Sequence, residues 1–501
     1  MKIGVLDILS GSISLTWLEK VYDGWFRKHF ASMTPQAVSL WCRQLGHEVY
    51  YATYYGQTDP KNLLLDKLDI VFIATCTQAS PIAYALAKLF RREKTLTVIG
   101  GAHARSFPAD CLRFFDIVVQ DCDKTLINDI LKGSYDRGAL VTSGRRLQEM
   151  PSVEERLPEI SIAHFKRGRP TGLSWITLLA SIGCPYKCDF CIDWDKPYEL
   201  LPPERLAADL RFISKNFPGI FVQYHDPNFG IKFDKIMEIL MTIPKDERSP
   251  YIMGCSLSIL NRERMQKLLE TNCAFTLIGL ESWAAYSNKA GLGSITGQEK
   301  LEKIVVHLRE LYQYVKSLQV TLLFGTDADK GDEPVELTKK LIHMLPSIWP
   351  VLNIPIPFGG TPLFERYLAA DRILKPMPFS FYCTPYLTTT LENYNPLEYY
   401  EKWIEINKAA ISGKLLLQRI STSKNPIQKL AHLLRTFAVW EQFFQMRRIR
   451  NLLKTDSKFR AFHDGQSNRL PEYYRWLYKK KLGRYAELIT EAEMTPEIEP
   501  L

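Results

Sequence analysis

The chain of 501 residues has a formal net charge of +9, with 46% hydrophobic and 24% charged residues. This length exceeds what one hydrophobic core supports, so two or three domains are expected. No run of 18 apolar residues occurs, which excludes a membrane-spanning helix of the usual length. The first apolar segment is short and interrupted by Asp7, which argues against a signal peptide. A cytoplasmic protein with reduced cysteines is therefore expected.

Residues 1–135 alternate between strand and helix signals. Helical stretches begin at Pro35 and Pro81, between short apolar strands. This alternation predicts a doubly wound α/β domain with a parallel sheet. Ligands of such sheets bind beyond the carboxyl ends of the strands. The predicted strands are KIGVLDI, HEVYYAT, DIVFIAT, LTVIGG and DIVVQD.

Two loops at those strand ends are candidates for ligand binding. One contains Thr77 and Gln78, and the other contains Gly100, Gly101 and His103. Paired glycines allow a ligand to approach the backbone closely. A tight turn followed by a histidine at the start of a helix is the alternative interpretation of the second loop.

A polar segment, residues 136–174, is interrupted by three prolines and is predicted to be a linker. Residues 175–370 then alternate between strand and helix signals again, which predicts a second parallel α/β domain. Its functional groups are expected at the carboxyl ends of the strands. The predicted strands are WITLLASIG, IFVQYHD, YIMGCSL, FTLIGLES, VTLLFG and VLNIPIPF.

The loop after the first of these strands carries Cys184, Cys188 and Cys191 in a C-x3-C-x2-C pattern. Three thiolates can hold three irons of a [4Fe–4S] cluster and leave the fourth iron open to another ligand. A structural zinc site would need a fourth ligand, usually from a second close cysteine pair, which the sequence lacks. Phe190 stands where an aromatic ring can pack beside a purine. Three unrelated loop cysteines are the alternative interpretation.

This cysteine loop resembles that of the radical S-adenosylmethionine (SAM) enzymes. In that family the amino and carboxylate groups of SAM chelate the open iron. An electron from the cluster then cleaves SAM to methionine and a 5′-deoxyadenosyl radical. The resemblance implies that residues 175–370 form a partial (β/α)6 barrel with these two cofactors at its strand ends.

Residues at three further strand ends extend the resemblance. A D-x-x-F pattern implies that Asp226 lies near the SAM amino group, where a carboxylate can accept hydrogen bonds from an ammonium. A G-x-E-S pattern implies that Glu281 reaches the ribose hydroxyls, and Gly325 can give adenine access to the backbone. Asp226 as a turn residue and Glu281 as a structural residue are the alternatives. His225 can be an acid, a base or a structural histidine, so no catalytic residue is assigned.

The sequence VIGGAHARSFPADCL, followed by FDIVVQ, resembles the cobalamin-binding domain upstream of many radical SAM enzymes. It implies cobalamin at the two strand-end loops of the first domain. The D-x-H-x-x-G motif, whose histidine ligates cobalt from below, is absent, so no ligation through that motif is expected. Methylthiotransferases carry a second cluster here instead. Cys76 fits one of its ligands, but Cys42 and Cys111 fall within predicted helices.

The combined resemblance is to the cobalamin-binding, class B methylase-like subgroup of the family. It implies methyl transfer to an unactivated carbon or phosphorus, with an electron from an external flavodoxin- or ferredoxin-like donor. A small-molecule or lipid-like substrate is expected. Radical rearrangement or oxidative cyclisation without methyl transfer, methylthiotransferase-type chemistry, and a non-enzymatic cluster protein are the alternatives.

Residues 371–501 are predicted to be a helical region with uneven charge. Residues 411–484 contain 17 Lys and Arg against four acidic residues, a net charge of +13. A solvated helix surface, an anionic membrane surface at the inner face, and an anionic substrate or redox partner all fit this charge. No nucleic-acid partner is expected, because no RNA-binding module is recognisable. The closing acidic residues TEAEMTPEIEPL are expected to be frayed.

Overall fold

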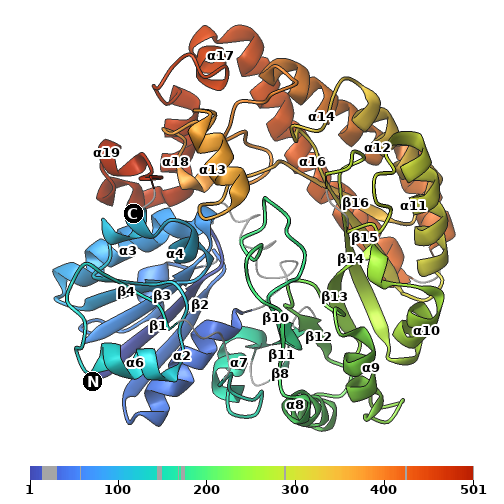
Figure 1. Ribbon diagram of the computed structural model, residues 1–501. Coiled ribbons are helices and arrows are strands. Elements are labelled where there is room, and N and C mark those ends of the chain that lie inside the picture. Colours follow the sequence, from blue (N-terminus) through green and yellow to red (C-terminus); the bar gives the residue numbers. More distant parts are fainter. Residues whose placement is uncertain are drawn as a thin grey trace.

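The computed structural model describes residues 1–13, 31–56, 58–143, 149–166, 169–170, 175–286, 289–423 and 426–499. Two parallel six-stranded sheets lie on opposite sides of the molecule, and the C-terminal helices arch over both (Figure 1). The predicted α/β fold with two parallel sheets and a helical C-terminal region is confirmed. In the described part of the chain, no helix is both long enough and apolar enough to cross a membrane.

The first sheet has the strand order β2-β1-β3-β4-β5-β6, with every pairing parallel. Alternate side chains of β1 enter two different cores: Ile3 and Val5 pack with α2 and α6, whereas Leu6 and Ile8 pack with α3. This period of two makes the sheet doubly wound. The strands are β1 (Lys2–Ile8), β2 (Glu48–Tyr54), β3 (Ile70–Thr75), β4 (Leu96–Gly100), β5 (Ile117–Val119) and β6 (Ala139–Val141). The helices are α2 (Met33–Gln44), α3 (Ser80–Arg92), α4 (Ala102–Ser106), α5 (Pro108–Leu112) and α6 (Lys124–Leu131).

The segment predicted as a linker contributes structure to the first domain. Strand β6 pairs with β5 at the sheet edge. Helix α7 (Leu157–His164) docks on α2, where the buried carboxylate of Glu159 accepts hydrogen bonds from Ser39 Oγ at 2.7 Å and Arg43 Nη2 at 2.8 Å. A charged pair of this kind fixes the connection between the two sheets. Two short strands, β7 (Phe165–Lys166) and β8 (Arg169–Pro170), follow α7.

The second sheet has the order β16-β15-β14-β13-β12-β9, again parallel throughout, and forms the expected partial barrel. The strands are β9 (Trp175–Leu178), β12 (Phe221–Tyr224), β13 (Tyr251–Ser256), β14 (Cys273–Glu281), β15 (Ser317–Leu323) and β16 (Trp349–Asn353). The helices are α8 (Pro203–Asn216), α9 (Phe233–Met241), α10 (Arg262–Glu270), α11 (Gly297–Leu311), α12 (Glu333–Met344) and α13 (Pro362–Ala369). A small hairpin, β10 (Ser181–Ile182) with β11 (Glu199–Leu200), follows β9.

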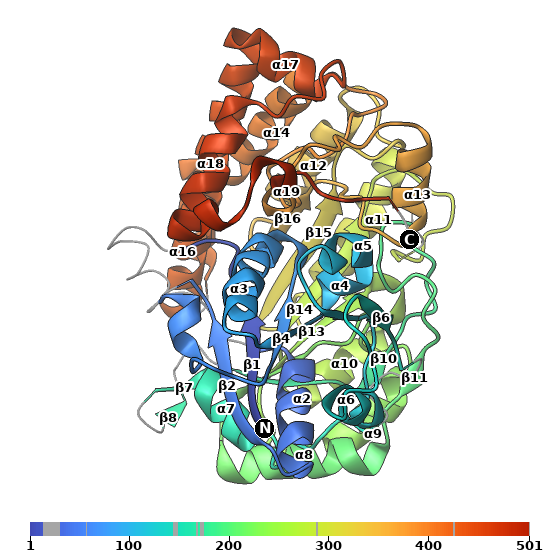
Figure 2. The same cartoon turned by 90° about the vertical axis from the view of Figure 1, so that its left-hand side faces the viewer.

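The C-terminal helices share one hydrophobic core with the first sheet and the outer strands of the second. Helices α16, α17 and α18 lie along one side of the molecule (Figure 2). The helices are α14 (Pro396–Ala410), α15 (Gly413–Thr422), α16 (Pro426–Thr455), α17 (Ser457–His463), α18 (Glu472–Leu482) and α19 (Glu491–Met494).

The expectation of a frayed acidic end is wrong for the described residues up to 499. Glu493 forms an ion pair with Lys88 Nζ of α3 at 2.5 Å. The backbone N–H of Glu497 donates to Asp110 at 2.7 Å, and Ile498 is buried. The acidic tail therefore docks on the basic and apolar surface of the first domain, which local sequence composition alone does not reveal.

Candidate functional site

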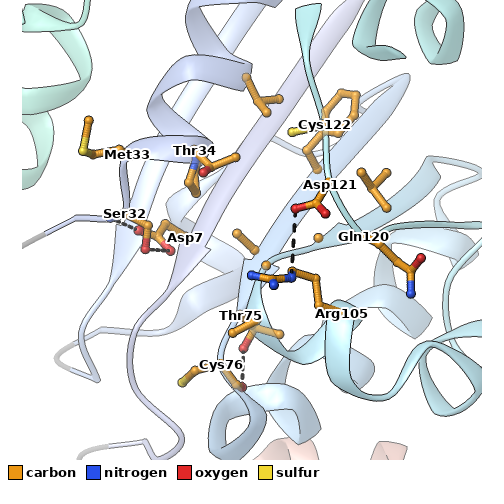
Figure 3. A pocket seen from close by; sticks show the side chains of 18 of the residues that line it. Asp7, Ser32, Met33, Thr34, Thr75, Cys76, Arg105, Gln120, Asp121 and Cys122 are labelled. Carbon is orange, nitrogen blue, oxygen red and sulfur yellow. Dashed lines mark hydrogen bonds and ion pairs between the residues drawn. The ribbon is translucent and has the colours of Figure 1, made fainter. Parts of the chain in front are cut away.

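A cavity of about 400 Å³ lies between the two sheets. The carboxyl ends of the first sheet supply Leu9, Gly101 and Gln120 to its wall, and those of the second sheet supply Leu179 and His225. Figure 3 shows the side chains around it. Most of the lining is apolar, with a few polar groups, which is the usual composition of a small-molecule or cofactor site. The cavity occupies the strand-end position expected for a ligand of the first domain.

Gly100 and Gly101 lie on the cavity wall, as the sequence analysis placed them. Gly101 has φ +94°, and a Cβ there would lie 2.9 Å from Thr75 O and 3.0 Å from Thr75 N. Both the backbone conformation and the space therefore require glycine. Strand β4 consequently passes into α4 without a side chain between the backbone and the cavity.

Thr77, Gln78 and His103 do not line the cavity. Thr77 is buried, and its carbonyl accepts a hydrogen bond from Ser80 Oγ at 2.9 Å, whereas Gln78 is exposed. The roles predicted for these three side chains in cofactor binding therefore have no support in the cavity's geometry.

His103 is a core residue. Its Nε2 lies 2.5 Å from Tyr84 Oη, and its ring packs edge-on against Phe379 at 4.8 Å between centroids. Its Nδ1 has no hydrogen-bond partner among the described residues. Burial lowers the pKa of His103 to about 3, so the imidazole is neutral at physiological pH.

Replacing His103 with leucine is expected to lower the free energy of unfolding while leaving cofactor uptake intact. The substitution leaves the buried Tyr84 hydroxyl with one partner fewer, which costs about 1–3 kcal/mol. Denaturant unfolding and a cobalamin titration of the same preparation measure the two effects. A loss of cobalamin affinity without a loss of stability would instead place His103 in the binding site.

Asp7 is a polar residue of the cavity that the sequence analysis treated only as an interruption. It is the next-to-last residue of β1, is 1% exposed, and accepts hydrogen bonds from the backbone N–H of Ser32 at 2.8 Å and from Ser32 Oγ at 3.2 Å (Figure 3). Burial raises the pKa of Asp7 to about 6. Its position at the end of a buried strand was the available signal.

Arg105 of α4 connects the first domain to the cysteine loop. Its Nη2 donates to the carbonyl of Ile192 at 3.3 Å and to Asp193 Oδ1 at 3.4 Å. Its Nε lies 4.0 Å from Asp121 Oδ1 (Figure 3). Because Ile192 directly follows Cys191, this contact places the cavity wall beside the loop that carries the three cysteines.

The cysteine loop begins at Gly183, whose φ of +68° and contact with Pro197 O admit no side chain. Two backbone hydrogen bonds close the loop: Cys184 N donates to Lys196 O at 3.2 Å, and Cys191 N donates to Cys188 O at 3.1 Å. Burial raises the pKa of Cys188 to about 11, and the neighbouring Lys289 partly offsets this. The thiols are close enough to influence one another electrostatically.

The three thiols lie on one loop, as the ligands of a [4Fe–4S] cluster would. No three His, Cys, Asp or Glu side chains converge on a single metal-ion position among the residues that the structure describes. A [4Fe–4S] cluster instead takes one thiolate per iron, so its ligands are spread around a larger object. Three thiols on one loop, buried or half-buried at the carboxyl end of β9, suit that arrangement.

Asp226, at the end of β12, supports this loop directly. One carboxylate oxygen accepts from Ser181 Oγ at 2.6 Å, and the other accepts from the backbone N–H of Ala180 at 3.0 Å. Burial raises the pKa of Asp226 to about 6. In the structure the carboxylate positions the segment that leads into the loop; contact with SAM stays a prediction.

Glu281 and Lys289 form an ion pair beside the cysteines. Their Oε1 and Nζ atoms are 2.9 Å apart, and the Glu281 side chain is 6% exposed. Glu281 has φ +63° and ends β14 at a break in the strand register. A non-glycine residue in this conformation is strained, and such strain is common at functional sites. Burial lowers the pKa of Lys289, but Glu281 together with Cys188 and Cys191 more than offsets this and holds it above its usual value.

Phe190 faces the same ion pair. Lys289 Nζ lies 5.7 Å from the centroid of its ring, and Tyr286 stacks on the ring with centroids 5.9 Å apart. The structure thus brings Phe190, Glu281 and the cysteine loop together.

Gly325 has a different neighbour. A Cβ added at this glycine would lie 2.6 Å from the ring of Tyr399. The glycine makes room for Tyr399 of α14, and its predicted contact with adenine stays a prediction.

Comparison with known proteins agrees with this site. Residues 178–337 match the Radical SAM superfamily. The chain is 26% identical over 397 residues to bacteriochlorophyllide d C-8(2)-methyltransferase of Chlorobaculum tepidum, covering 74% of this chain and 83% of that protein. It is also 26% identical to hopanoid C-3 methylase of Methylococcus capsulatus, covering 54% and 55% of the two chains.

Solved structures share the fold. The cobalamin-dependent SAM radical enzyme OxsB, solved with aqua-cobalamin, aligns with a TM-score of 0.59 and 13% identity, covering 99% of this chain and 82% of its own. The radical SAM methyltransferase TsrM of Kitasatospora setae, solved with tryptophan and a SAM analogue, aligns with a TM-score of 0.51 and 13% identity, covering 75% and 77%. The match to OxsB extends over the first sheet, the partial barrel and the C-terminal helices together.

Proposed function

Because this chain belongs to the radical SAM superfamily, we propose that it cleaves SAM reductively at a [4Fe–4S] cluster and transfers a methyl group with the help of cobalamin. The proposed acceptor is an unactivated carbon or phosphorus. The observation that carries the proposal is the cavity shared by the carboxyl ends of both sheets. One side of it is the glycine-lined wall of the first domain, and the other is the segment that leads into the cysteine loop.

Each group of residues has a distinct part in this proposal. Cys184, Cys188 and Cys191 hold the cluster, and Asp226 holds the strand before them in place. Glu281 and Phe190 offer a carboxylate and an aromatic face to SAM. When bound, the cluster and SAM supply the radical, and cobalamin supplies the methyl group. Arg105 keeps the two half-sites at a fixed distance through its bonds to the loop.

Cobalamin fits the first half-site through its glycines and apolar strand ends. Gly100 and Gly101 lie on the cavity wall and add no side chain to it, which would suit a flat macrocycle. A second cluster is disfavoured, because Cys42 and Cys111 are buried inside α2 and α5.

The proposed reaction also requires an electron donor and a substrate. The cluster needs one electron per SAM cleaved, which a flavodoxin- or ferredoxin-like donor in the cytoplasm would supply. All ten cysteines are free thiols, as a reducing compartment requires. The relatives are named for bacteriochlorophyllide and hopanoid methylation. We therefore favour a lipid-like substrate over a polar one.

Replacing Ala102 with phenylalanine is expected to weaken cobalamin binding at least about tenfold without changing iron content. Ala102 lines the cavity at the start of α4, so the added ring occupies space that a cofactor would need. Bulk at Gly101 would be a poorer test, because its Cβ would meet the backbone of Thr75. Visible absorbance of the anaerobic protein titrated with cobalamin is the measurement.

The matched control is Ala208→Phe on the exposed face of α8, which should bind cobalamin like the wild type. Equal uptake by the Ala102 and Ala208 variants would move the site elsewhere. No uptake by the wild type would remove cobalamin from the proposal.

A further inference from the structure

One face of α16 presents an apolar stripe to solvent. Its six large side chains are between 40% and 70% exposed. They recur at spacings of three and four residues, so they share one face of the helix. The opposite face packs into the core through Met446, Ile449 and Leu453, which are fully buried. The six exposed residues, called the α16 stripe below, are Leu430, Leu433, Leu434, Phe437, Trp440 and Phe444.

Such a stripe is unusual on a soluble surface. Single exposed apolar side chains are common, but contiguous exposed patches mark interaction sites. The stripe contains three aromatic residues, including Phe437, which is 70% exposed. Trp476 of α18, 46% exposed, adds a fourth large aromatic, because its ring lies 4.9 Å from the guanidinium of Arg448 of α16. Among the residues that the structure describes, this second apolar face of α16 therefore has no partner.

The surroundings of the stripe are strongly basic. The sequence of α16 contains six Lys and Arg but one acidic residue, Glu441. Lys429 and Arg447 are exposed at the margin of the stripe. Arg448 and Lys480 lie over the ring of Trp476, at 4.9 Å and 5.4 Å from its centroid. The partner must therefore offer an apolar phase and negative charge together.

We propose that the α16 stripe docks the protein on the surface of an anionic lipid bilayer. The apolar side chains would enter the boundary between headgroups and acyl chains, and the basic side chains would meet the headgroup charge. Trp and Tyr are enriched at this depth because their rings are apolar and their N–H or O–H groups polar. The helix would lie in the plane of the interface, since it is not apolar enough to span it.

A second copy of the chain is a poorer partner for this face. A two-fold interface sets the same patch against itself. It would bring two sets of basic side chains together, because the stripe lies within residues 411–484, whose net charge is +13. Like charges in contact oppose association. An anionic bilayer satisfies both the apolar and the basic groups.

Flotation of the full-length protein with vesicles tests the proposal. Wild type should float with vesicles of phosphatidylcholine and phosphatidylglycerol at about 0.05 M salt, and much less at about 0.5 M salt, where charge is screened over a few ångströms. It should float little with phosphatidylcholine alone. The assay needs neither SAM nor cobalamin, so its outcome is independent of the proposed chemistry.

Three double variants separate the contributions. Phe437→Asn with Phe444→Asn should lower vesicle affinity more than tenfold, because two aromatic rings can then no longer be buried among the acyl chains. Lys429→Gln with Arg447→Gln should lower it about 25-fold, about fivefold per charge. The control, Leu269→Asn with Val306→Asn, removes side chains that are 54% and 64% exposed on α10 and α11 and should float like the wild type.

Two results would overturn the proposal. One is the absence of wild-type flotation on anionic vesicles at low salt. The other is equal flotation of the Phe437/Phe444 variant and the Leu269/Val306 control. A dimer detected by sedimentation in the absence of vesicle binding, and lost in the Phe437/Phe444 variant, would assign the face to a second copy instead.

Discussion

Replacing any one of Cys184, Cys188 and Cys191 with alanine is expected to lower 5′-deoxyadenosine formation at least about a hundredfold. Each thiolate holds one iron, and a cluster with a missing ligand is no longer held in a fixed geometry. Bound iron should fall in the same variants. The measurement is iron content together with the yield of 5′-deoxyadenosine after anaerobic reduction with SAM present.

The matched control is Cys273→Ala. Cys273 is also buried, but it begins β14, at the end of the strand away from the cysteine loop. Its removal should cost some stability and leave iron and 5′-deoxyadenosine at the wild-type level. A Cys188→Ala variant with full iron and normal product would contradict the ligand assignment.

Replacing Glu281 with alanine is expected to weaken SAM binding about 10- to 100-fold while iron content stays near the wild-type value. A hydrogen bond to a charged group contributes about 1.5–3 kcal/mol, and Glu281 is a buried carboxylate held beside the cysteines. Its backbone is in the left-handed region, with φ +63°. A strained conformation of this kind is common at functional sites. Equilibrium binding of SAM to the reconstituted protein measures the effect.

Two further variants distinguish a role of Glu281 in SAM binding from a purely structural role. Glu299→Ala removes an exposed carboxylate that pairs with Lys303 on α11, and it should change nothing. Lys289→Met leaves Glu281 buried without its cation and should lower stability. If Glu281→Ala lowered stability as Lys289→Met does but left SAM affinity intact, Glu281 would be a structural residue.

Much of the fold was predictable because its signals are local. The strands of both sheets are short apolar runs, and the helices between them begin at prolines or polar residues. The second sheet therefore contains the six strands that were predicted, and the cysteines follow its first strand. The ends of β4 and β14, at Gly100 and Glu281, were placed correctly, whereas β12 ends at Tyr224, two residues before the predicted end at Asp226.

Side-chain direction was harder to predict, since it depends on contacts between distant segments. His103 stands only two residues after Gly101 of the cavity wall, yet it points into a core formed with Tyr84 and Phe379. Gly325 is required by a tyrosine from a helix about 75 residues later. The tail docks because Lys88 and Asp110 of the first domain are in reach of it. None of these pairings leaves a periodic signal in the sequence.

The most direct test of the proposed function is the product profile of the anaerobic, cluster-reconstituted protein incubated with SAM, a reductant and cobalamin. We expect 5′-deoxyadenosine whenever the cluster is reduced, and S-adenosylhomocysteine when cobalamin is present, because methyl groups then leave SAM. The Ala102→Phe variant should form 5′-deoxyadenosine and little S-adenosylhomocysteine. Formation of 5′-deoxyadenosine alone, with or without cobalamin, would contradict methyl transfer and favour a radical rearrangement or cyclisation. The absence of both products would contradict SAM cleavage itself.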